Sequence, residues 1–102
     1  MVKTMKRKGF DTKIALILKK INECKSEKND DVAVKSLKIS ETYEELGRLC
    51  TRAGKKNGAA KAFKSAEKYD MKFIRSEFSY DKALMKRTLK ERKAHWKNII
   101  KN

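Results

Sequence analysis

Few residues in this 102-residue chain could carry out catalysis or hold a metal ion. The single histidine, His95, and the two cysteines, Cys24 and Cys50, lie far apart in a spacing that matches no common metal site. A nucleophilic triad would have only His95 as its base, and no flanking motif supports that role. We therefore expect a protein that is not an enzyme, with no metal and no cofactor.

Two other short patterns also fail as reactive sites. Residues 54–58, GKKNG, superficially resemble a phosphate-binding loop, but they lack its four-residue gap and its Gly-Lys-Ser/Thr ending. The acidic pairs at residues 30–31 and 44–45 are better explained as helix caps and exposed surface than as an acid and a base. The remaining chemical signal in the sequence is its charge.

The positive charge is concentrated in two regions. The formal net charge is +15. Residues 1–28 contain nine basic and three acidic residues, residues 29–54 contain four and five, and residues 55–102 contain fifteen and five. Self-repulsion of this size favours an anionic partner, and nucleic acid is the commonest one.

Lysines near the C-terminus recur every three or four residues, which places them along one side of a helix. The line over residues 82–101 would be about 29 Å long, comparable with several phosphates along a nucleic-acid backbone. Lysine is a point charge that does not read base edges, so we expect binding with little sequence specificity. The candidate nucleic-acid-binding residues are Lys61, Lys64, Lys68, Lys72, Arg75, Lys82, Lys86, Lys90, Lys93, Lys97 and Lys101, with Lys6, Arg7 and Lys8 of the N-terminal segment.

Two further residues near these lysines have alternative roles. Trp96 could stack on a base, as aromatic residues do in single-strand binders, but its place on an apolar stripe favours core packing. Arg92 is expected either to extend to solvent from beside that stripe or to mark where the last helix leaves the core for a partner.

The composition and the spacing of apolar residues predict an all-α fold. The chain has no proline, four glycines and 40% charged residues, which favours helices over strands and turns. We predict a basic arm at residues 1–9 and a single helical domain at residues 10–102. The expected helices are residues 11–25, 32–53 and 58–68, followed by a long C-terminal helix, 71–100, whose stripe is Ile74, Phe78, Met85, Leu89, Trp96 and Ile100.

Polar residues and a glycine predict where these helices begin and end. The predicted N-caps are Asp11, with Phe10 packing back as a hydrophobic staple, then one of Asn29, Asp30 and Asp31, then Asn57, and finally Asp70. Gly54 is predicted to end the second helix in the left-handed conformation. The small residues Gly47, Ala59, Ala60 and Ala66 are expected where the second and third helices touch.

Residues 43–66 resemble a single tetratricopeptide repeat. Tyr43, Leu46-Gly47 and Cys50, followed by Ala59, Phe63 and Ala66, have the spacing of that pattern, with Tyr43 in place of the usual Trp and Cys50 in place of Tyr. The resemblance implies a tightly packed helical hairpin, with one flanking helix on each side, since no second copy is visible. The three-helix microtubule-interacting and transport domain is similar in outline and is the alternative family.

The resemblance also implies a peptide-binding groove on the inner face of the first hairpin helix. Glu41 and Glu44 have the wrong charge for the basic clamp that some family members use for acidic peptide tails. The candidate groove residues are Glu41, Glu44, Arg48, Thr51 and Arg52.

The sequence lacks features of membrane-spanning or secreted proteins. No apolar run approaches the ~20 residues that span a bilayer, and the basic N-terminus is not followed by a signal-peptide core. Compartment and spacing favour two free thiols over a Cys24–Cys50 disulfide. We expect a soluble, intracellular protein with no small-molecule substrate.

Three hypotheses about the partner remain open. The first is a component of a ribonucleoprotein, such as a ribosome, that binds RNA in preference to DNA. The second is a tetratricopeptide-like adaptor for an acidic protein. The third, an anionic membrane, is weaker because the basic line does not lie opposite a free apolar face.

Overall fold

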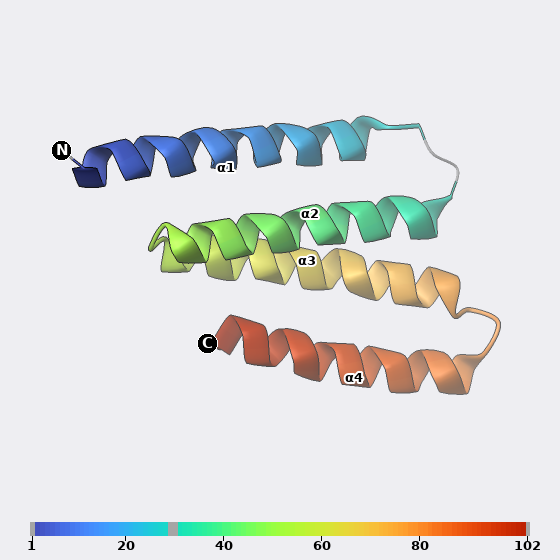
Figure 1. Ribbon diagram of the computed structural model, residues 1–102. Coiled ribbons are helices and arrows are strands. Elements are labelled where there is room, and N and C mark those ends of the chain that lie inside the picture. The colour runs from blue at the N-terminus through green and yellow to red at the C-terminus, as the bar shows by residue number, and fades with distance from the viewer. Residues whose placement is uncertain (1, 29–30, 102) are drawn as a thin grey trace.

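The computed structural model describes residues 2–28 and 31–101, with side chains from residue 9 onward. Within these ranges the chain forms helices and no strands, and consecutive helices run in opposite directions (Figure 1). The predicted all-α class with four helices is confirmed. The helices are α1 (Val2–Ser26), α2 (Val32–Arg52), α3 (Lys56–Glu77) and α4 (Lys82–Lys101).

The four helices lie in one row, in chain order (Figure 1). The backbones approach closely between α1 and α2, α2 and α3, and α3 and α4, and among the described residues no other pair of helices approaches as closely. The Cα atoms span 55 × 33 × 12 Å, so the molecule is much thinner than it is long or wide. The row therefore has two broad faces.

The closest packing is between α2 and α3, where small residues let the two helices approach. A Cβ atom on Gly47 would lie 2.6 Å from the ring of Phe63, so only glycine fits beside that ring. Ala59 and Ala66 are buried on the facing side of α3, with Ala66 0% exposed. The predicted contact of small residues in this hairpin is confirmed, while Ala60 lies at its edge and is only partly buried.

Two of the predicted helix ends are confirmed. Asp31 caps α2 by accepting a hydrogen bond from the Val34 backbone N–H at 3.2 Å. Gly54 follows α2 with φ at 77°, a left-handed conformation that glycine adopts without strain. The Lys55 N–H then donates to the Cys50 carbonyl at 2.8 Å, which closes the end of the helix. The other candidate caps of α2, Asn29 and Asp30, lie outside the described residues.

The predicted start of the first helix is wrong. α1 begins at Val2, nine residues before the predicted start at Asp11, so the basic segment at residues 1–9 is part of a helix from Val2 onward. Lys, Met and Arg form helices readily, and the single Gly9 costs only about 1 kcal/mol relative to Ala. Asp11 is therefore not a cap, and its carboxylate instead pairs with Lys55 of the α2–α3 connection at 2.7 Å.

The predicted limits of the third helix are also wrong. α3 begins with Lys55 at its N-cap, without a side-chain cap, so Asn57 lies inside the helix. α3 continues to Glu77 instead of ending near Lys68. Asp70 does not start a new helix because its carboxylate is buried and hydrogen-bonded to side chains of α4, as described below.

The long C-terminal helix predicted over residues 71–100 is two antiparallel helices instead. The chain turns at residues 78–81, and Asp81 caps α4 by accepting from the Leu84 N–H at 3.1 Å. Ile74 therefore belongs to α3 and Trp96 to α4, and both side chains are buried in the same core. The sequence Ser79-Tyr80-Asp81 carries the signal that the stripe of apolar residues hid, because Asp and Ser favour helix starts.

Both cysteines are free thiols that pack as core residues. Cys24 of α1 is 8% exposed and Cys50 of α2 is 5% exposed. Burial raises the pKa of the Cys50 thiol, and the nearby Lys55 ammonium opposes that shift. The structure thus contains no disulfide between them, as the sequence favoured.

A matched pair of glycine substitutions tests the packing of the hairpin. We expect Gly47→Ala to destabilise the protein by about 1–3 kcal/mol, because the new methyl group overlaps the Phe63 ring. Gly9→Ala should instead stabilise α1 by about 0.5–1 kcal/mol, since a Cβ at Gly9 meets nothing within 4 Å. Urea unfolding followed by circular dichroism measures both. Two changes of the same sign would contradict the close contact at Gly47.

Candidate nucleic-acid interface

The lysines predicted to form a line on the last helix lie on α4. All six are exposed, and they follow one another in steps of three and four residues along the whole helix. A helix of this length keeps them within about 29 Å, as expected from the sequence. The residues are Lys82, Lys86, Lys90, Lys93, Lys97 and Lys101.

A second line of basic residues lies on α3. Lys72 and Arg75 fall within the long helix predicted over residues 71–100, but they belong to α3 and continue its line, because the chain turns after Glu77. All members of this line are exposed and lie roughly opposite the buried Ala66. They are Lys61, Lys64, Lys68, Lys72 and Arg75.

Both lines lie on the same broad face of the row. On α4 the lysines fall about a quarter turn from Trp96, at ~100° per residue, on the flank away from Arg92. Arg92 reaches from the other flank to Asp70 of α3 and lies near Glu44 of α2. The two lines therefore share the face on the other side, and together they form one basic area, which we call the α3–α4 lysine surface.

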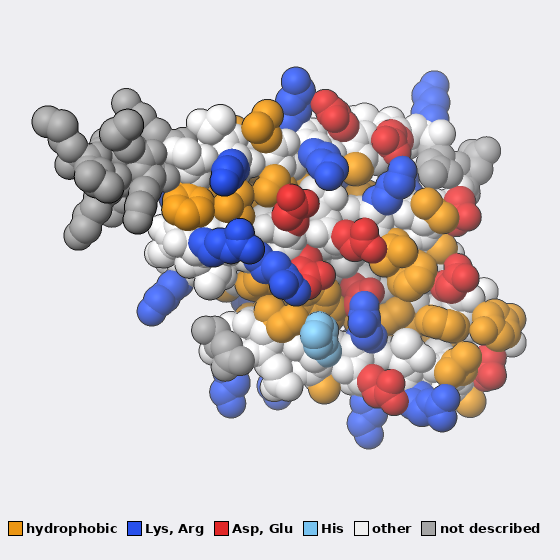
Figure 2. Space-filling model, viewed as in Figure 1, with side chains coloured by type: hydrophobic (Ala, Val, Ile, Leu, Met, Phe, Trp, Pro, Cys, Tyr) orange, Lys and Arg blue, Asp and Glu red, His pale blue; other side chains and the backbone are white. Residues whose placement is uncertain are grey.

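The described carboxylates do not neutralise this surface. The ion pairs within the described residues are Lys38–Glu27, Arg48–Glu44, Lys55–Asp11 and Arg92–Asp70, and none of them includes a residue of the α3–α4 lysine surface. On the face shown in Figure 2, acidic side chains lie among basic ones across the middle of the molecule, and basic side chains project along the edge formed by α4. On this face, therefore, the two signs are mixed.

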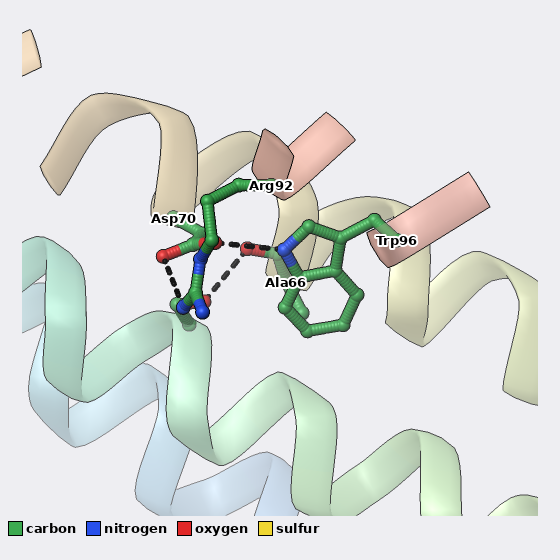
Figure 3. Close-up of polar contacts among 5 residues, drawn as sticks. Ala66, Asp70, Arg92 and Trp96 are labelled. Carbon is green, nitrogen blue, oxygen red and sulfur yellow. Dashed lines mark hydrogen bonds and ion pairs between the residues drawn. The ribbon is translucent and has the colours of Figure 1, made fainter. Parts of the chain in front are cut away.

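A buried carboxylate sets the position of α4 relative to α3. Asp70 of α3 is 1% exposed, and it accepts hydrogen bonds from Arg92 Nε at 2.9 Å, Arg92 Nη2 at 3.2 Å and Trp96 Nε1 at 2.8 Å (Figure 3). The bond to Asp70 raises the pKa of Arg92, and partial burial opposes that shift. One turn earlier, the Ala66 carbonyl accepts from the Ser40 hydroxyl of α2 at 2.7 Å. These contacts connect three consecutive helices through α3.

The same contacts decide the roles of Trp96 and Arg92. Trp96 is 2% exposed and packs beside Phe63, with ring centroids 6.4 Å apart, so its ring has no face available to a base. The core-packing interpretation of Trp96 is confirmed. Arg92 neither extends freely to solvent nor marks a departure of α4 from the core, because its guanidinium is held by Asp70.

The residues of the candidate peptide groove are only partly brought together. Glu44 pairs with Arg48 at 2.6 Å, and the Thr51 hydroxyl donates to the Gly47 carbonyl. Glu41 is exposed on the same helix. Arg48 and Arg52 border a groove of about 420 Å³ between α1 and α2, whose other lining residues are Lys13, Leu16, Ile17, Glu45 and Leu49.

The structure brings together one cluster of side chains that the sequence did not indicate. Lys25 of α1 contacts Tyr43 of α2 and lies near Tyr69 of α3, and no pattern in the sequence brings these three helices together. The side chains of Lys6, Arg7 and Lys8 lie outside the described residues, although their backbone belongs to α1.

Comparisons with known proteins do not indicate a family or a function for this chain. No family model, curated protein or solved structure matches it. Among the described residues, no three side chains of His, Cys, Asp or Glu come close enough to hold a metal ion. None of the helices in these ranges combines the length and apolar character needed to cross a bilayer.

Asp70 provides a test of how α4 is held. We expect Asp70→Ala to destabilise the protein by about 2–4 kcal/mol, because it leaves the buried Trp96 N–H without an acceptor and the Arg92 guanidinium without its carboxylate. Asp11→Asn removes only the ion pair between exposed Asp11 and Lys55 and should cost less than about 1 kcal/mol. Urea unfolding followed by Trp96 fluorescence measures both free energies. Equal costs for the two variants would show that Asp70 does not hold the helices together.

Proposed function

We propose that this protein is a non-catalytic binder of nucleic-acid backbone that docks on RNA through the α3–α4 lysine surface, as a component of a ribonucleoprotein such as a ribosome. The observation that carries the proposal is the row of exposed basic side chains on two adjacent helices, none of them in a described ion pair. Phosphates spaced along a strand are a partner that can neutralise such a row.

The chemistry of the surface supports recognition of backbone charge rather than sequence. All but one of its members are lysines, whose ammonium groups attract phosphates without the planar fork that arginine uses for base edges. Trp96 is buried, so its ring cannot serve as a stacking platform for a base. Binding should therefore depend on strand charge and shape, with similar affinity for unrelated sequences.

The salt dependence of binding tests this function. Fluorescence anisotropy with a labelled single-stranded RNA should give a log–log slope of affinity against salt of about −4 to −5, since about six phosphate contacts release counterions. Running the same assay with DNA of the same sequence measures the expected preference for RNA. A slope shallower than about −1 would contradict binding to a polyanion.

Substitution on α4 locates the site. We expect the variant Lys86→Gln/Lys90→Gln/Lys93→Gln/Lys97→Gln to lose affinity by more than about tenfold at 0.1 M salt and to make the slope shallower by about 3. The matched control replaces four lysines that have no described partner and lie outside the surface, and it should change affinity far less. Equal losses of affinity for the two variants would mean that binding depends on the net charge of the protein and not on the α3–α4 lysine surface. The control substitutions are Lys19→Gln, Lys20→Gln, Lys28→Gln and Lys56→Gln.

A second function, as an adaptor for an acidic protein, is favoured by the groove between α1 and α2. Its apolar floor of Leu16, Ile17 and Leu49 has Arg48, Arg52 and Lys13 at its rim, against one glutamate. This charge suits an acidic amphipathic helix. We also propose that the α2–α3 hairpin is a single tetratricopeptide-like unit, supported by the contact of Gly47 with Phe63.

Reversing one charge tests the adaptor. Arg52→Glu should weaken binding of a synthetic acidic amphipathic helix of about fifteen residues by about tenfold, because it turns a groove of positive character towards neutral. Lys90→Glu, on α4, makes the same change in charge away from the groove and should leave that affinity within about twofold. Isothermal titration calorimetry measures both, and equal effects would remove the groove as the site.

A further inference from the structure

Two tyrosines and three lysines from three helices form a cluster on the face that carries the α3–α4 lysine surface. Tyr43 of α2 and Tyr69 of α3 stack with ring centroids 5.8 Å apart and an interplanar angle of 17°. Lys25 of α1 donates a hydrogen bond to the Tyr43 hydroxyl at 2.7 Å. Its Nζ lies 5.2 Å from the Tyr43 centroid and 5.7 Å from the Tyr69 centroid.

Two lysines of α3 complete the cluster. The Nζ atoms of Lys68 and Lys72 lie 5.9 Å and 5.5 Å from the centroid of Tyr69. Three ammonium groups thus lie within 6 Å of one ring, and no carboxylate among the described residues forms an ion pair with any of them. The ring quadrupole stabilises each cation by only about 0.5–1 kcal/mol at exposed sites, while the like charges repel one another.

The geometry determines what kind of ligand this cluster would take. The hydrogen bond to Tyr43 holds the Lys25 ammonium in place, and the exposed Lys68 and Lys72 lie close enough to Tyr69 to join it around a ligand. The hydrogen bond to Tyr43 raises the pKa of Lys25, so this contact stabilises the charged ammonium. Three ammonium groups close to one ring suit the multiply hydrogen-bonding oxygens of a phosphate group.

We infer that the cluster of Lys25, Tyr43, Lys68, Tyr69 and Lys72 is a phosphate-binding site, and that its ligand is a phosphate of the bound nucleic-acid strand. The second part rests on the proposed function. Lys68 and Lys72 belong both to this cluster and to the basic line of α3. A strand on the α3–α4 lysine surface would therefore reach the cluster at the edge where α3 meets α2 and α1.

A double substitution with a charge-matched control tests the inference. Lys25→Gln/Lys72→Gln should weaken binding of a single-stranded RNA by about tenfold and make the salt slope shallower by about 1.5. Lys19→Gln/Lys20→Gln lowers the net charge equally but changes exposed residues of α1 outside the cluster, so we expect less than a threefold loss. Equal losses for the two variants would overturn the inference. Circular dichroism checks that both variants stay folded.

A second measurement separates this inference from the proposed function. Inorganic tripolyphosphate titrated into the ¹⁵N-labelled wild-type protein should shift the amide signals around Lys25, Tyr43 and Tyr69 most strongly, and Lys25→Gln/Lys72→Gln should abolish those shifts. If tripolyphosphate binds there but RNA does not, the phosphate site stands and the proposed function fails. If RNA binds while tripolyphosphate leaves these signals unchanged, the proposed function stands and the inference fails.

Discussion

The arrangement of the basic surface depends on one buried carboxylate. Asp70 accepts hydrogen bonds from two side chains of α4 at once, and it lies one turn after the carbonyl that Ser40 of α2 binds. A charge with 1% exposure is costly unless it is paired, so this position permits little variation in how α4 packs. With Trp96 and Arg92 directed at Asp70, the lysines of α4 are left on the flank that continues the basic line of α3.

The single row of helices determines how the charges can be used. The inner helices are each exposed mainly along one side: α2 along the side with Glu41, Glu45 and Arg48, and α3 along the side with its basic line. One face carries mixed charges, including the Glu44–Arg48 pair, and the other carries the α3–α4 lysine surface. The two proposed functions therefore use different surfaces, and binding at one does not by itself exclude binding at the other.

The sequence predicted the fold class, the α2–α3 hairpin and the exposure of the lysines, because these depend on local spacing and composition. Asp31 and Gly54 act through backbone conformations that neighbouring residues determine, so they too could be predicted. The role of Asp70 could not be predicted. An aspartate that follows a helical segment looks the same in the sequence whether it caps a new helix or accepts hydrogen bonds from side chains far along the chain. The turn between α3 and α4 was also hidden. Both helices need an apolar side facing the core, so the stripe of apolar residues from Ile74 to Ile100 continues through the turn without a break.

The order of contacts in the row also bears on how the chain folds. Among the described residues, each helix packs mainly on its neighbours in the sequence, and the connections between the helices are short. The entropy lost in closing loops is therefore small, which favours fast folding. As in solenoid proteins, the free energy of unfolding is then close to the sum of the contributions of the individual helices and of the interfaces between neighbouring helices. Either outer helix can separate locally while the central hairpin persists, so the edges of the row should exchange amide hydrogens before its middle.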